Sequence, residues 1–176
     1  MNPVLIVPGF GGSGPGHWQT LWENSNPSFR RVIQQDWDHP VCSEWKSQLE
    51  KDVAASGPDV ILVAHSLACL LVAHWAADTR LKIKSALLVA VPDPASAAFP
   101  KEAVGFAPVP AQKFSFPSIL VASTSDSFSD LKYSERCAKA WGSRFVNIGD
   151  AGHINADSNL GAWDEGFSLL KSLMHD

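Results

Sequence analysis

The stretch of residues 60–77 contains no Asp, Glu, Lys or Arg. Its first part, residues 60–64, is an aliphatic run typical of a buried strand, and residues 66–77 predict a helix that is apolar on nearly every side. A strand and a helix that both lack charge are suited to burial on all sides. This pair therefore predicts the centre of an α/β fold, with the strand inside the sheet and the helix packed against it.

Short apolar runs alternate with amphipathic segments along the rest of the chain. The predicted strands cover residues 4–7, 29–34, 60–64, 83–91, 118–123 and 144–148. The predicted helices cover residues 17–24, 43–55, 66–77, 130–141 and 161–174. Strict alternation of this kind implies six parallel strands joined by right-handed crossovers in a single three-layer α/β/α domain, residues 1–176. Ligands bind beyond the carboxyl ends of such strands, so we expect the chemistry in the loops that follow them.

Composition excludes several classes of function. Fourteen basic and eighteen acidic residues give a formal net charge of −4, and the only adjacent basic pair is Arg30-Arg31, which argues against nucleic acid or an anionic membrane as a partner. Cys42, Cys69 and Cys137 form neither a CxxC motif nor an even set, so we expect no disulfide framework and no metal site. The chain also lacks a signal-peptide pattern. We expect a cytoplasmic protein and leave its oligomeric state, monomer or homodimer, open.

A serine follows the central predicted strand, in the sequence Ala64-His65-Ser66-Leu67-Ala68. In the nucleophile elbow G-x-S-x-G, small residues flank a serine on a tight turn between a strand and a helix. Here alanine replaces both glycines, so the match is to small-x-Ser-x-small. The alternative interpretation is that Ser66 only caps the helix that follows, a position that serine favours.

A nucleophilic serine needs a base and an orienting carboxylate on later loops. Asp126 follows the fifth predicted strand, 60 residues after Ser66, and His153 follows the sixth, 27 residues later. This is the order serine, acid, histidine of the α/β-hydrolases. Asp93, after the fourth strand, competes with Asp126 for the acid role, whereas Asp130 suits the N-cap of the next helix.

Acyl transfer also needs N–H donors for the oxyanion. Leu67 offers one, and the glycine loop after the first strand offers a second, from Phe10 or alternatively Gly11. Residues 92–116, with five prolines, form the longest loop and are predicted to overhang a shallow pocket. The candidates for substrate contact are Gly9, Gly11, His17, Trp18, Phe99 and Phe106. No cofactor is required.

The chain resembles the α/β-hydrolases, and within them the small serine hydrolases of the retinoblastoma-binding-protein-9 and YdeN type. The resemblance rests on PGFGGSGPGHWQTLWE, QQDWDHP, VAHSLACLLVAHWA, STSDSF and AGHINADSNLGAWDEG, and it spans nearly the full chain. It implies Ser66, Asp126 and His153 as catalytic residues. It also implies a reduced hydrolase sheet of order 2-1-3-4-5-6 that lacks the two N-terminal antiparallel strands. The 92–116 loop is itself too short for a folded lid domain, so we expect none. The two alanines of the elbow and the missing proline after Asp126 depart from the family pattern.

The function that these residues predict is hydrolysis of small carboxylic esters through an acyl-serine. A non-catalytic binding module on the same fold is the first alternative, with Trp18, Trp22 and Trp37 as its surface. A dinucleotide-binding domain is the second, because Gly9-x-Gly11-x-x-Gly14 follows a strand and Asp36 lies 22 residues beyond Gly14. However, the helix pattern resumes only near His17, whereas that fingerprint needs its third glycine inside the helix.

Overall fold

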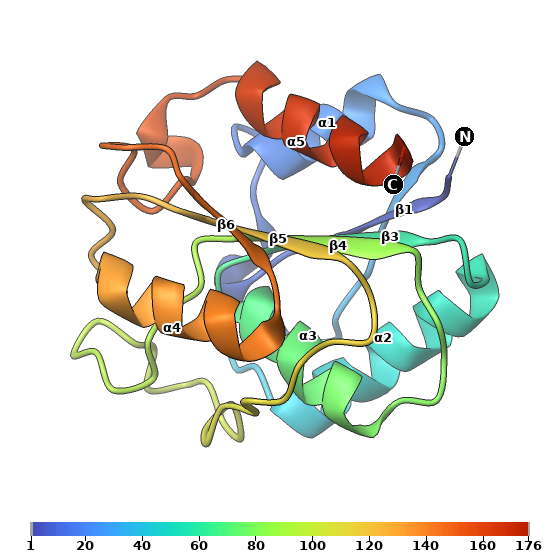
Figure 1. Cartoon of the computed structure of the whole chain (residues 1–176), viewed down its shortest axis with the longest axis horizontal. Helices are drawn as coiled ribbons and strands as arrows, with labels where there is room; N and C mark the ends of the chain where they lie inside the picture. Colours follow the sequence, from blue (N-terminus) through green and yellow to red (C-terminus); the bar gives the residue numbers. More distant parts are fainter. Residues whose placement is uncertain (1, 176) are drawn as a thin grey trace.

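A computed structural model describes residues 2–175 and contains one six-stranded sheet (Figure 1). All neighbouring strands pair in parallel, in the order β2-β1-β3-β4-β5-β6. The predicted single-domain α/β architecture and strand order are confirmed. The strands are β1 (Val4–Val7), β2 (Phe29–Arg31), β3 (Ile61–His65), β4 (Ser85–Val89), β5 (Ser118–Ala122) and β6 (Arg144–Asn147).

Five α-helices cover the two faces of the sheet. Figure 1 shows α1 (Trp18–Ser25) and α5 (Asp164–His175) above it, and α2 (Cys42–Ser56), α3 (Leu67–Asp78) and α4 (Leu131–Trp141) below it. Two short 3-10 helices, η1 (Phe10–Gly12) and η2 (Ala156–Ser158), lie in loops. No helix among residues 2–175 is long and apolar enough to cross a membrane.

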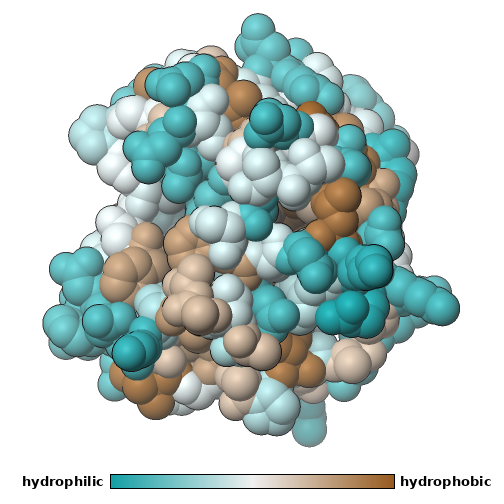
Figure 2. All heavy atoms as spheres, turned by 90° about the vertical axis from the view of Figure 1, so that its left-hand side faces the viewer, coloured by the Kyte–Doolittle hydropathy of each residue, from teal (hydrophilic) through white to brown (hydrophobic). Residues whose placement is uncertain are grey.

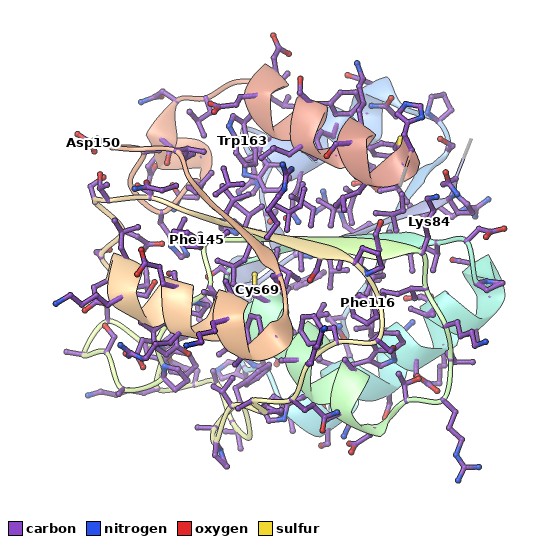
Figure 3. The ribbon with its side chains drawn as sticks, in the orientation of Figure 1. Cys69, Lys84, Phe116, Phe145, Asp150 and Trp163 are labelled. Atoms are coloured by element: carbon purple, nitrogen blue, oxygen red, sulfur yellow. The ribbon has the colours of Figure 1, made fainter. Side chains whose placement is uncertain are left out.

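Neighbouring residues along the central strands point to opposite faces of the sheet and pack into two separate hydrophobic cores. Leu62 and Ala64 of β3 pack toward α2 and α3, whereas Ile61 and Val63 pack toward α1 and α5. Figure 3 shows the same division, with Phe116 and Cys69 on one side of the sheet and Trp163 on the other. Because the central strands are covered on both faces, they read as continuous apolar runs.

Helix α3 is buried along most of its length, which explains its lack of charge. Eight of its residues are buried, from Leu67 to Ala73 and Trp75. Fully burying an aliphatic side chain stabilises the fold by roughly 1.5–3 kcal/mol, whereas an unpaired charge at these positions would be strongly destabilising. The polar groups that are present find partners, and Glu50 of α2 accepts hydrogen bonds from the Trp75 indole and the Thr79 hydroxyl.

Some element boundaries differ from the predicted ones. The second strand ends at Arg31 rather than residue 34. Val32 makes one further backbone bond to β1, and Gln34 already donates to the Trp45 carbonyl of α2. Helix α5 begins at Asp164 rather than residue 161, because Gly161 and Trp163 have positive φ angles of 57° and 43°. Asp130 caps α4 as predicted, accepting from the Tyr133 N–H at 2.7 Å.

Candidate active site

Ser66 sits at the sharp turn between β3 and α3. Its φ of 56° and ψ of −123° are rare for a residue with a side chain, and such strain is typical of functional sites. It precedes the first residue of α3, yet its hydroxyl makes no capping hydrogen bond to the helix. The interpretation of Ser66 as a simple helix cap is therefore wrong. Ala64 and Ala68, on either side, are fully buried.

The Ser66 hydroxyl instead lies 2.7 Å from His153 Nε2. On the other side of the imidazole, Nδ1 lies 2.9 Å from both carboxylate oxygens of Asp126. The side chains of His153 and Asp126 are only 10% and 3% exposed. The structure thus brings together the three residues that the sequence predicts, from the loops after β3, β5 and β6. With the Asp126 carboxylate as acceptor for Nδ1–H, the neutral imidazole presents a lone pair to the serine.

The competing acid, Asp93, and the nearby Asp130 both have other roles. Asp93 accepts a hydrogen bond from the Ala95 N–H at 2.8 Å and stabilises a turn in its own loop. Asp130 caps α4. Asp126 itself accepts from the Phe128 N–H at 2.9 Å, which fixes the carboxylate in place for the imidazole.

Two side chains hold the backbone of the loop that carries His153. The ring of His65 donates from Nε2 to the His153 carbonyl at 3.0 Å, and the indole of Trp18 donates to the Ile154 carbonyl at 2.8 Å. Ile154 has a φ of 48°, which is strained for a β-branched residue. Sequence reasoning missed His65, and it assigned Trp18 to substrate contact. Trp18 is in fact 1% exposed and acts from beneath the site.

The glycine loop after β1 presses directly against the elbow. A Cβ on Gly9 would lie 2.7 Å from the His65 carbonyl oxygen and 3.1 Å from the Leu67 nitrogen. The Gly11 N–H is already bonded to the Trp37 carbonyl at 3.0 Å, so Gly11 is not a free oxyanion donor. The N–H groups of Phe10 and Leu67 have no acceptor within residues 2–175 and remain available.

Arg31, at the end of β2, clamps this loop from outside. Its guanidinium donates to the Gly12 carbonyl at 2.7 Å and the Ser13 carbonyl at 3.1 Å, and it pairs with Glu23 at 2.7 Å. Gln19 is fully buried and ties the Ser13 hydroxyl to the carbonyls of β1 and β3. Sequence reasoning missed both residues, because neither belongs to a pattern of spacing.

The model of the family described as serine hydrolase matches residues 4–172. The chain belongs to the serine hydrolase family. No curated protein sequence matches it significantly.

Solved structures of the same fold include a YdeN-like hydrolase from Pectobacterium atrosepticum, with 27% identity, a TM-score of 0.88, and coverage of 99% of this chain and 91% of the other. The YdeN gene product of Bacillus subtilis has 16% identity and a TM-score of 0.80, with both chains covered in full. A thermophilic esterase from Thermogutta terrifontis has 16% identity and a TM-score of 0.70 over 99% of this chain and 90% of its own. The predicted membership in the α/β-hydrolase superfamily is confirmed.

In this hydrolase a cavity of about 430 Å³ opens at Ser66 and His153. Its apolar lining comes from Phe10, Leu67, Pro92, Ala98, Pro100 and Phe128. The rest carries polar groups, from Ser13, His17, His65, Asn155 and Asp157. Figure 2 looks at the edge of the sheet where this cavity opens and shows apolar surface gathered over its centre and lower half, with hydrophilic residues around it.

The structure separates the predicted substrate contacts into two groups. Gly11 and His17 line the cavity, together with the start of the 92–116 loop and with Phe10, which was predicted as an oxyanion donor. Phe106 does not line it, because the side chain is 1% exposed in the core beside α2. Phe99 faces a different hollow on the outer side of the same loop, and Gly9 is covered by the elbow.

The buried histidines beside the cavity are neutral. Burial, followed by the charges of Arg31 and His153, lowers the pKa of His17 to about 4. Burial also holds the pKa of His65 well below its usual range. His17 Nδ1 accepts from the Gln19 N–H at 3.2 Å, so its proton is on Nε2. Neither ring brings a positive charge to the site at neutral pH.

The residues that suggested the two alternative functions have structural roles instead. Helix α1 begins only at Trp18, four residues after Gly14, so the glycine loop does not open a helix as a dinucleotide fingerprint requires. Asp36 accepts hydrogen bonds from the N–H groups of Asp38 and His39. Trp18 and Trp22 are 1% and 2% exposed, so they offer no binding surface.

Proposed function

We propose that this serine hydrolase cleaves small carboxylic esters through an acyl-enzyme on Ser66. The observation that carries the proposal is the continuous chain of hydrogen bonds from the Ser66 hydroxyl through His153 to Asp126, at 2.7 Å and 2.9 Å, on the wall of a cavity. Membership in the serine hydrolase family and the fold shared with an esterase support it.

In the proposed mechanism His153 Nε2 removes the Ser66 proton as the hydroxyl oxygen attacks the ester carbonyl. Asp126 holds the tautomer and stabilises the imidazolium, and general base catalysis of this kind contributes roughly 10²–10⁴-fold. The N–H groups of Phe10 and Leu67 hold the oxyanion, where one donor contributes on the order of 10²–10³-fold. His153 then protonates the departing alcohol, and water releases the acyl group with His153 again as base.

The size of the cavity supports a small substrate. A volume of about 430 Å³ with a partly apolar lining suits a short acyl chain. The three cysteines are free and buried, which supports the proposed cytoplasmic location.

The test is hydrolysis of p-nitrophenyl acetate together with labelling by a fluorophosphonate probe. Ser66→Ala should abolish both while the protein stays folded, whereas Ser115→Ala, an exposed serine far from the site, should leave both unchanged. Asp126→Asn should reduce kcat by about 10⁴-fold, and Asp93→Asn should have little effect. Full activity in Ser66→Ala would refute the proposal, and a wild-type Ser66 that resists labelling would favour the binding module.

A further inference from the structure

Charged groups are distributed unequally around the cavity. No lysine or arginine lines it, and His17 and His65 are neutral for the reasons given above. Apart from the hydrogen-bonded group of Ser66, His153 and Asp126, the charge on its surface is the carboxylate of Asp157, which is exposed on η2. An anionic substrate would therefore enter without a counter-charge.

The loops at the carboxyl ends of the strands are acidic as a group. Residues 8–17, 32–41, 90–106, 123–132 and 148–160 carry eight carboxylates and two lysines, a net charge of −6, while the remaining chain carries twelve basic and ten acidic residues, a net charge of +2. The net charge of these loops, −6, is thus more negative than the net charge of the whole protein, −4. Asp150, at the left-hand tip in Figure 3, is one of these groups.

The two lysines of these loops do not offset the carboxylates at the cavity. Lys101 lines the outer hollow with Phe99, and Lys132 lines another hollow beside Asp93 and Asp130. None of the eight carboxylates pairs with a lysine or arginine within residues 2–175, where the ion pairs of lysine and arginine are Arg31–Glu23 and Lys46–Asp78. Among residues 2–175, Asp157 is therefore the carboxylate that lines the cavity without a lysine or arginine partner.

From this arrangement we infer that the site selects uncharged and cationic esters and rejects anionic ones, with Asp157 as a specificity-determining residue at the mouth. A cleft of one sign concentrates ligands of the opposite sign and repels those of the same sign. The inference rests on the proposed function, since it names the substrate class of the same site. By this inference, acyl carriers that bear phosphate groups are poor substrates, and so are half-esters of dicarboxylic acids.

Three activated esters of similar size test it. They are p-nitrophenyl pentanoate, which is neutral, the p-nitrophenyl monoester of succinic acid, which is anionic, and p-nitrophenyl 4-(trimethylammonio)butyrate, which is cationic. We expect kcat/KM at low salt to be about tenfold lower for the anionic than for the neutral ester, and the cationic ester to match or exceed the neutral one. In 1 M salt, where the screening length is about 3 Å, the gap should narrow.

Two substitutions locate the effect. Asp157→Asn should raise kcat/KM for the anionic ester about threefold relative to the neutral one, a change of the size expected for one exposed charge. Asp157→Lys should raise it further and reduce the rate for the cationic ester. The control Asp59→Lys makes the same change in net charge at an exposed position before β3, and it should leave the ratio unchanged.

The outcomes separate this inference from the proposed function. Equal kcat/KM for the neutral and anionic esters at low salt, or a ratio that responds equally to Asp59→Lys and Asp157→Lys, would overturn the charge selectivity while ester hydrolysis stands. No turnover of any of the three esters, together with no labelling of Ser66, would refute the proposed function itself. Because the readout is a ratio of substrates, a loss of folded protein in one variant does not change it.

Discussion

The two loops that border the cavity are held in different ways. The loop of residues 9–14 is fixed by distant partners. Its backbone bonds to the Arg31 guanidinium and the Trp37 carbonyl, and the Ser13 hydroxyl donates to the buried Gln19. The second loop, residues 92–100, is built mostly from its own turns. Within it the N–H groups of residues 95, 96, 98 and 99 bond to acceptors two or three positions earlier.

The difference matches what each loop meets. The first carries an N–H that must lie about 3 Å from a developing oxyanion, where a small misplacement is costly. The second meets the apolar part of the substrate, where contacts are less directional. We infer that the proposed catalytic geometry depends on the whole fold, whereas substrate range depends on a segment that can change locally.

The strongest test of the rigid loop is Gly9→Ala. The new Cβ would meet the His65 carbonyl at 2.7 Å and the Leu67 nitrogen at 3.1 Å, so the loop must move away from the elbow. We expect kcat/KM for p-nitrophenyl acetate to fall about 10²–10³-fold, as when an oxyanion donor is lost. The control is Gly16→Ala, where the added Cβ meets nothing within 4 Å. Equal activity of the two variants would show that the loop does not depend on this close approach.

The end of the same loop makes stability depend on pH. The folded protein protonates His17 only near a pKa of about 4, whereas the unfolded chain takes up this proton near 6.5, so stability falls as the pH drops from 6.5 toward 4. On acidification from pH 7 to pH 5, protonation of His17 in the unfolded chain should lower the free energy of unfolding by about 2 kcal/mol. This is about 30-fold in the unfolding equilibrium.

The measurement for this prediction is urea unfolding at the two pH values. His17→Asn keeps a good N-cap residue for α1 and removes the titrating group, so its loss of stability on acidification should be smaller by that amount. An unaltered pH dependence in His17→Asn would place the titration elsewhere.

Arg31→Lys tests the clamp itself. Lysine keeps the charge but cannot reach two carbonyls, Glu23 and Thr20 together, as the guanidinium does. We expect kcat to fall about tenfold with little change in KM, because the Phe10 N–H is displaced by a fraction of its hydrogen-bond length. The same change at its exposed neighbour, Arg30→Lys, serves as control. A rise in KM at constant kcat would assign Arg31 to ground-state binding instead.

The contrast between the loops also shows which parts of this protein the sequence can predict. The charge-free stretch 60–77 predicted β3 and α3 because burial acts on every residue of a segment and leaves a continuous pattern. Ser66, Asp126 and His153 were found because parallel strands bring the loops after them to one edge. Arg31, Gln19 and His65 each donate from one side chain to distant carbonyl groups. A single contact of this kind produces no periodic pattern in the sequence.

The wall of the cavity was the least predictable part. Phe99 and Phe106 were chosen for their size, but residues 92–116 form no helix or strand that would fix which side chains face inward. The loop places Ala98 and Pro100 at the cavity, packs the partly buried Phe99 against the core, and buries Phe106 within the core.

The locally built wall should therefore respond to substitution with the smallest effect and the clearest selectivity. Ala98→Leu narrows the apolar side of the cavity. We expect kcat/KM for p-nitrophenyl acetate to change less than about twofold and kcat/KM for p-nitrophenyl hexanoate to fall about fivefold. An effect of this size is typical of adding or removing one or two methylene groups in an apolar pocket. Ala97→Leu adds the same side chain to the neighbouring residue, which faces the outer hollow, and should affect neither ester. If Ala98→Leu reduced acetate hydrolysis as much as hexanoate hydrolysis, this wall would support the proposed catalytic geometry rather than the acyl chain, and the two loops would no longer differ in role.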